Sequence, residues 1–177
     1  MTLPMPLGDA PPDRESHSDA WYTPAWILER VRVQWPDGID LDPAWHPACL
    51  VKARTTYTAQ DDGLAHRWTG NVWNNPPYSS PGDWVVKARA SAKKGAHVLQ
   101  LVKFDPSTKW FQEVWRDASA LAVFRRRLRF VNGHGEDAGT ANFPCCLIYW
   151  APWGADLTYF HRAWSPHAQI VEWVDRP

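Results

Sequence analysis

The segment of this sequence best suited to chemistry is Asn75-Pro76-Pro77-Tyr78. It follows the apolar stretch 71–74, a predicted strand, and ligands of open α/β sheets bind at the carboxyl ends of strands. The Asn75 side chain and the Pro76 main chain each offer a carbonyl oxygen, the prolines have no N–H to compete, and Tyr78 offers a flat ring. Two such acceptors can hold both N–H groups of a ring-conjugated amine and leave its lone pair free to attack a methyl group. The segment therefore predicts methyl transfer to an amine; the alternative is a proline-rich turn that only ends the strand.

Predicted strands and helices alternate along most of the chain and must position this segment. Apolar runs predict strands over 39–42, 71–74, 96–103, 120–124, 128–131, 143–150 and 169–174. Helical spacing predicts helices over 24–34, 47–53, 82–94 and about 108–118. We expect Thr23 to cap the first helix and Ser107 or Thr108 to cap the last. The alternation predicts an α/β domain over 20–177 with a mixed, mostly parallel sheet, after a flexible tail over 1–19.

Charge is distributed unevenly along a chain whose formal net charge is zero. Residues 51–133 carry 14 basic and 6 acidic groups, and both flanking segments are acidic. The densest basic run contains Arg125, Arg126, Arg127 and Arg129. Such a run can contact nucleic-acid phosphates, or it can be a solvated strand end that pairs with the acidic ends of the chain. The 13 tryptophans likewise supply either core mass or ring faces for stacking on bases.

Several function classes find no support in the sequence. Three cysteines, two of them adjacent, do not form a disulfide framework, so we expect a reduced chain. Cys49, His46 and His66 lack the paired spacing of a zinc site, so we expect no metal. The most apolar run, 143–155, is too short to cross a bilayer, and the N-terminus lacks the basic start and apolar stretch of a signal peptide. We therefore expect a cytoplasmic monomer with no membrane partner.

An ordered set of short motifs surrounds the Asn-Pro-Pro-Tyr segment. In chain order they are WYTPAW (21–26), IDLDPAW (39–45), DDGL (61–64), W-x-G-x-V-W-N-N-P-P-Y-S (68–79), LVKFDPSTKWF (101–111), RLRF (127–130) and FPCCLIYW (143–150). This set resembles the phage-type (Dam-related) DNA N6-adenine methyltransferases over about residues 20 to 150. The resemblance implies a Rossmann-like methyltransferase fold, S-adenosylmethionine as methyl donor, and a bacterial or phage-infected cell as the setting.

The resemblance also implies a substrate and the roles of the catalytic segment. The substrate is adenine in double-stranded DNA, which must flip out of the helix to reach the site. Asn75 and the Pro76 carbonyl would hold its amine, Pro77 would stiffen the loop, and Tyr78 would stack on the base.

Three further segments match cofactor-binding motifs of the family. Thr23-Pro24 matches the segment against the methionine part of the cofactor, and Asp42-Pro43-Ala44 matches the segment that contacts its amino acid moiety. Asp62 stands where relatives accept a hydrogen bond from the adenine amine of the cofactor, with Asp61 equally available. The chain departs from the family in lacking a Gly-x-Gly loop after the first strand, where no glycine occurs before Gly63.

Three alternatives remain open from the sequence. The chain could methylate another amine, such as RNA adenine, cytosine N4 or a protein glutamine. It could be a DNA-binding relative that has lost catalysis, as the missing glycine loop suggests. It could also be a non-catalytic module that binds a partner through its tryptophans.

Overall fold

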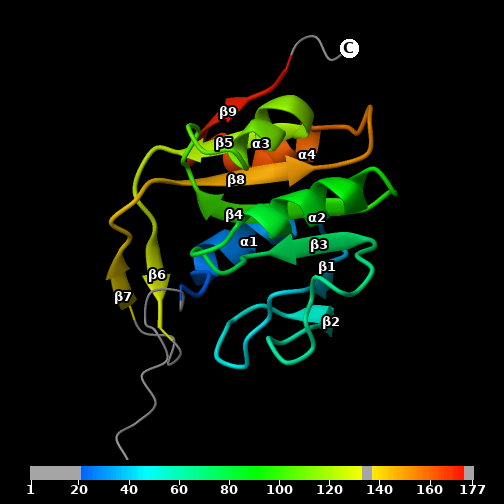
Figure 1. Cartoon of the computed structure of the whole chain (residues 1–177). Coiled ribbons are helices and arrows are strands. Elements are labelled where there is room, and N and C mark those ends of the chain that lie inside the picture. Colours follow the sequence, from blue (N-terminus) through cyan, green and yellow to red (C-terminus); the bar gives the residue numbers. More distant parts are fainter. Residues whose placement is uncertain (1–20, 133–136, 174–177) are drawn as a thin grey trace, which may run out of the picture.

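A seven-stranded sheet forms the centre of the computed structural model, which describes residues 21–132 and 137–173 (Figure 1). Its strands, in spatial order, are β2 (Ala53–Thr56), β1 (Ile39–Asp42), β3 (Asn71–Asn74), β4 (His97–Lys103), β8 (Cys145–Trp150), β5 (Ala120–Phe124) and β9 (Ala168–Val171). The first four strands are parallel, β8 is antiparallel to both β4 and β5, and β9 is antiparallel to β5. Strands β1 to β5 therefore share one direction, which confirms the predicted α/β class with a mixed, mostly parallel sheet. The expected tail over 1–19 lies outside the described residues.

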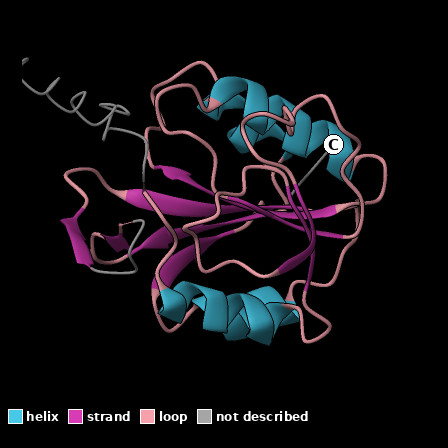
Figure 2. Ribbon diagram, turned by 90° about the horizontal axis from the view of Figure 1, so that it is seen from below, coloured by secondary structure: helices cyan, strands magenta, loops and turns pink. Residues whose placement is uncertain are grey.

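Two helices cover each face of the sheet (Figure 2). The four are α1 (Ala25–Gln34), α2 (Gly82–Ala92), α3 (Phe111–Asp117) and α4 (Thr158–Trp164). Successive strand residues point to opposite faces, so Leu99 and Leu101 of β4 pack in the core under α1 and α4. Val98 and Val102 pack instead with α2 and α3. Burial on both faces explains the nearly continuous apolar runs of the central strands.

A two-stranded hairpin of β6 (Arg129–Val131) and β7 (Asp137–Thr140) lies beside the main sheet (Figure 1). The N-terminal segment joins this hairpin through Tyr22, whose N–H and carbonyl both bond to the backbone of Val131. The chain then passes through Thr23 and Pro24 into α1. This segment lies beside the end of β3, because the Trp21 carbonyl bonds to Asn75, the residue after that strand.

The structure corrects several boundaries, lacks one predicted helix, and contains three elements that were not predicted: β2, β7 and α4. The helix predicted over 47–53 is absent; turns occupy this stretch, and β2 pairs its backbone with β1 from Ala53 onward. Helix α2 ends at Ala92, two residues before the predicted end. The last strand ends at Val171, and the remainder of its predicted range includes a residue outside the described chain.

The side-chain caps predicted for α1 and α3 are absent from the structure. Helix α1 begins after Pro24 with no side-chain cap, and the Thr23 hydroxyl is buried without a hydrogen-bond partner in the described structure. Helix α3 begins only at Phe111, because the Ser107 and Thr108 hydroxyls bond to Asp105 in the preceding turn. Thr23 therefore keeps its hydroxyl free for another use.

Candidate active site

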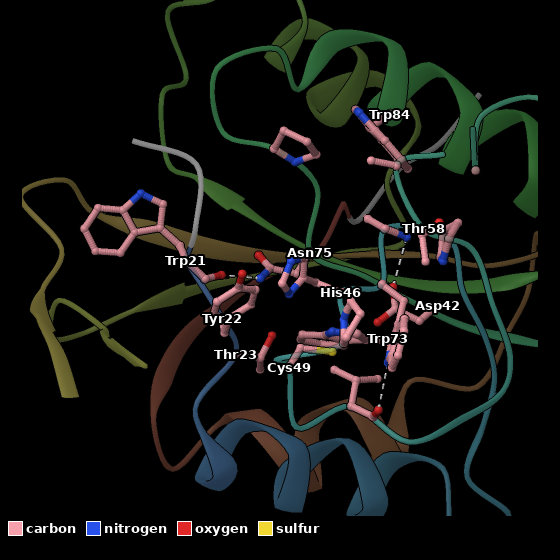
Figure 3. A pocket seen from close by; sticks show the side chains of 18 of the residues that line it. Trp21, Tyr22, Thr23, Asp42, His46, Cys49, Thr58, Trp73, Asn75 and Trp84 are labelled. Atoms are coloured by element: carbon pink, nitrogen blue, oxygen red, sulfur yellow. Dashed lines mark hydrogen bonds between the residues drawn. The ribbon is translucent and has the colours of Figure 1, made fainter. Parts of the chain in front are cut away.

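A cavity of about 670 Å³ opens where β1 and β3 end (Figure 3). The predicted residues that line it are Thr23, Asp42, Pro43, Ala44, Asp62, Asn75 and Pro77. Residues from four separate motifs thus meet at one edge of the sheet, as parallel strands allow. Pro24, Pro76 and Tyr78 do not line this cavity.

Two consecutive asparagines at the end of β3 have different surroundings. The Asn74 Oδ1 atom accepts a hydrogen bond from Gln100 Nε2 at 3.0 Å, inside the sheet. Asn75 lines the cavity, and its Nδ2 donates to the Trp21 carbonyl at 2.7 Å (Figure 3). Its Oδ1 is buried and has no hydrogen-bond partner among the described residues. The Trp21 bond therefore orients the amide and leaves one directed acceptor for a ligand.

Tyr78 is buried beside the cavity. Its side chain is 4% exposed, and its ring meets Phe130 and Phe143 edge to face, with centroids 5.9 and 5.5 Å away. Burial raises the pKa of the Tyr78 hydroxyl well above its ordinary value, so this group stays protonated. In this conformation aromatic neighbours cover the ring, and Tyr78 is not among the residues that line the cavity.

Asp42 is a buried carboxyl at the end of β1. Its Oδ1 accepts the Ala44 N–H at 3.0 Å, and its side chain has no ion pair in the described part of the chain. Burial raises the pKa of Asp42 to about 7, against the smaller lowering effect of the Ala44 bond. A cationic ligand group would supply the compensation that this carboxylate lacks.

A single glycine joins the two cofactor-binding segments expected from the sequence. A Cβ atom at Gly63 would lie 1.8 Å from the Pro43 carbonyl oxygen, so only glycine permits this approach. Gly63 holds Asp62 at the cavity, whereas Asp61 does not line it and accepts bonds from the Thr58 N–H and hydroxyl. The loop that contains Asp62 and the turn that follows β1 are thus in direct contact.

The sequence reasoning missed several residues that line the cavity. They are Trp21, Tyr22, Trp45, His46, Pro47, Cys49, Val51, Thr58, Ala59, Gln60, Gly63, Trp73 and Trp84. Trp73 is fully buried in the core, yet it also lines the cavity. Its spacing from Asn75 was the available signal, because residues two apart on a strand share a face.

Comparison with known proteins gives the chain a family. The model of the family described as DNA N-6-adenine-methyltransferase (Dam) matches residues 12–171. The chain belongs to the Dam family. It is 30% identical over 147 residues to the DNA N-6-adenine-methyltransferase of Haemophilus phage HP1, covering 78% of this chain and 82% of that protein. It is also 30% identical over 106 residues to the DNA N-6-adenine-methyltransferase of Escherichia phage T1, covering 58% of this chain and 43% of that longer protein.

This Dam-family chain has a second cavity of about 750 Å³, here called the arginine groove. It is lined by Pro24, Trp26, Phe124, Arg125, Arg126, Arg127, Leu128, Arg129, Phe130, Val131, Pro166 and His167. Arg125, Arg126 and Arg127 are exposed and form no ion pair within the described residues. The predicted pairing with acidic ends of the chain is therefore not seen in that part of the structure.

Within 21–132 and 137–173, no three His, Cys, Asp or Glu side chains gather in a way that could hold a metal ion. No helix in these ranges is long and apolar enough to cross a membrane.

Proposed function

We propose that the chain transfers a methyl group from S-adenosylmethionine to the N6 amine of adenine in double-stranded DNA. The observation that carries this proposal is the buried, unpartnered Oδ1 of Asn75 at the cavity edge. Family membership and the similarity to phage DNA N-6-adenine-methyltransferases support DNA adenine as the substrate.

The site residues fit the methyl donor through its polar groups. The Thr23 hydroxyl and the Asn75 carbonyl, which have no hydrogen-bond partner among the described residues, border one cavity together with the buried Asp42 carboxyl. We assign Asp42 to the ammonium of the cofactor, Thr23 and Pro43-Ala44 to its methionine part, and Asp62 to its adenine amine. Pro24 lines the arginine groove and would support Thr23 from the backbone. When bound, the cofactor supplies an electrophilic methyl group on a sulfonium sulfur.

The protein's part in the chemistry is to hold the amine. Asn75 Oδ1 and the Pro76 carbonyl accept its two N–H groups, which turns the nitrogen lone pair toward the methyl carbon. A bond forms from nitrogen to this carbon, and the carbon–sulfur bond breaks with its electron pair left on sulfur. The alkylated nitrogen then releases a proton to water, so Asn75 acts without taking a proton.

DNA binding is assigned to the arginine groove and base recognition to the catalytic segment. Arg125, Arg126, Arg127 and Arg129 would contact phosphates, which position the duplex without reading its sequence. The adenine must leave the duplex to reach Asn75. Stacking on Tyr78 requires its ring to be uncovered, so we propose that Phe130 or Phe143 shifts when the base enters.

The test is transfer of labelled methyl groups from S-adenosylmethionine to duplexes with and without adenine. We expect label in the adenine-containing duplex and none in the adenine-free duplex. Equal labelling of both duplexes would indicate another amine, such as cytosine N4. Labelling only of RNA or of protein glutamine would move the function to those substrates, and binding of DNA without any transfer would identify a relative that has lost catalysis.

A further inference from the structure

Asp42 and Trp73 are neighbours on adjacent strands of the sheet. Leu41 of β1 lies opposite Val72 of β3 in parallel register, so the next residue of each strand is also side by side. Both Asp42 and Trp73 line the first cavity (Figure 3). The register therefore places the side chains of Asp42 and Trp73 next to one another on the same face of the sheet, at the same cavity.

The indole N–H of Trp73 is an exception among the buried tryptophans. Four tryptophans of the described chain are almost completely buried: Trp68, Trp73, Trp150 and Trp164. Three of them donate from Nε1, to the Gly63 carbonyl at 2.8 Å, Gln100 Oε1 at 2.9 Å and Gln34 Oε1 at 2.7 Å. Trp73 Nε1 has no partner in the described structure. A buried donor without a partner is costly and rare, and its position on a cavity points to a ligand atom.

None of the described residues that line the cavity is lysine or arginine, and His46 is the one side chain among them that can carry a positive charge. An anionic ligand group next to Asp42 therefore meets no ammonium or guanidinium group among these residues, and neutral donors can supply its hydrogen bonds. Trp73 Nε1 and Thr23 Oγ1 are the two buried donors on this cavity whose bonding capacity is unused within the described residues.

We propose that Trp73 Nε1–H donates a hydrogen bond to the α-carboxylate of the methyl donor, whose ammonium pairs with Asp42. An acid and a neutral donor side by side form the complement of an amino acid zwitterion. This inference rests on the proposed function and deepens it, since it explains how a site whose described lining has no lysine, arginine or glycine-rich loop binds the carboxylate. Trp73 is thus a cofactor-binding residue as well as part of the core.

The test compares S-adenosylmethionine with its decarboxylated analogue, which keeps the ammonium and lacks the carboxylate. Calorimetry measures the affinity of both ligands for the wild type, Trp73→Phe and Trp164→Phe. Trp164→Phe is the matched control, because it removes an equally buried indole N–H that bonds to Gln34 outside the cavity. Melting curves establish that each variant is folded.

We expect Trp73→Phe to weaken binding of S-adenosylmethionine by about 10-fold to 100-fold, the usual effect of a hydrogen bond to a charged group. Its affinity for the decarboxylated analogue should stay within about 3-fold of wild type, and Trp164→Phe should leave both affinities unchanged. An equal loss for both ligands, or no loss, would overturn the role of the N–H.

A second measurement on the wild type covers the case in which Trp73→Phe does not fold. The Trp73 indole N–H resonance, followed by nitrogen-15 NMR, should move downfield with S-adenosylmethionine and not with the decarboxylated analogue. Identical shifts with both ligands would overturn the inference while leaving the proposed function intact. A wild type that binds neither ligand would overturn the cofactor assignment itself.

Discussion

The two cavities of this molecule hold their polar groups in opposite ways. The cavity at the ends of β1 and β3 holds the buried Asp42 carboxyl and two buried atoms, Thr23 Oγ1 and Asn75 Oδ1, that have no hydrogen-bond partner among the described residues. The arginine groove presents the exposed guanidinium groups of Arg125, Arg126 and Arg127, which form no ion pair within the described residues. Buried directed groups select a ligand by geometry, whereas exposed charges attract a polyanion over a distance and are screened by salt. We infer that one cavity provides the chemistry and the other provides affinity for DNA.

The two cavities are separated by a single extended segment. Thr23 lines the cavity at the ends of β1 and β3, and the next residue, Pro24, lines the arginine groove. The same segment holds Asn75 through the Trp21 carbonyl and bonds to Val131 of β6 through Tyr22. Substitutions on either side of it can therefore test whether the two activities are separable.

The largest effect is expected from Asn75→Ala. Loss of a preorganised acceptor costs about 100-fold to 1,000-fold in rate, so methyl transfer should nearly cease while DNA affinity is kept. The measurement is single-turnover methylation beside a DNA shift assay. Asn71→Ala is the matched control, because Asn71 lies at the other end of β3 and bonds to the Gly38 carbonyl. Near wild-type methylation by folded Asn75→Ala would remove the proposed mechanism.

Asp42→Ala should affect the cofactor and spare DNA. Removal of a buried partner of a charged group weakens binding by about 10-fold to 100-fold, and the groove arginines are untouched. Calorimetric titration of S-adenosylmethionine and a DNA shift assay give the two affinities. If DNA binding alone suffers, the cofactor role of Asp42-Pro43-Ala44 is wrong.

The pH dependence of the same carboxyl gives a smaller effect. Burial raises the pKa of Asp42 to about 7, whereas the unfolded chain has a pKa of about 3.9. The folded state thus binds this proton more tightly, so the contribution to stability is complete below about pH 4 and is lost as pH rises to about 7. Ligand affinity changes in the opposite direction, because the cofactor ammonium needs ionised Asp42.

We therefore expect affinity for S-adenosylmethionine to rise roughly 10-fold between about pH 5.5 and about pH 7. Asp42→Asn should abolish this rise and should gain stability relative to wild type over the same range. Calorimetry and melting curves across pH measure both. A wild-type affinity that is flat over this range would show that Asp42 does not titrate at the site.

The smallest effect concerns the arginine groove. Each neutralised phosphate contributes about −0.9 to the slope of log affinity against log salt, so replacing Arg125, Arg126 and Arg127 with Ala should flatten this slope by about 1 to 3 units. Affinity for S-adenosylmethionine should not change. Lys93→Ala with Lys94→Ala serves as a control, since both lysines are exposed at the end of α2. An unchanged slope with a lowered melting temperature would assign the arginines to the fold.

Local sequence signals predicted the central fold well and the edges poorly. Strands β1, β3, β4, β5 and β8 contain apolar runs that can be recognised in the sequence, and their alternation with helices is regular. Strand β2 contains the polar sequence ARTT and exists because β1 offers a backbone to pair with, which no local pattern reveals. Helix α4 was missed because it has only seven residues, too few for a helical period to be recognised, and it is stabilised by packing against α1.

The sequence predicted those residues of the candidate site that belong to recognisable motifs, and no others. Asn75 and Asp42 could be found because each follows a recognisable strand. Trp73 and Gly63 could not be assigned, because their roles depend on the register of β1 with β3 and on the distance from Gly63 to Pro43. Tyr78 is the opposite case, a motif residue whose surroundings the sequence did not predict. Its motif predicts a ring face open for stacking, whereas its contacts bury the ring.

The most direct test of the account is the identity of the methylated nucleoside. Duplex DNA is incubated with S-adenosylmethionine and the wild type or Asn75→Ala, digested, and analysed by mass spectrometry. The account predicts N6-methyladenine with the wild type and at least about 100-fold less with the variant. Methylcytosine as the product, no methylated nucleoside at all, or equal N6-methyladenine from both proteins would contradict it.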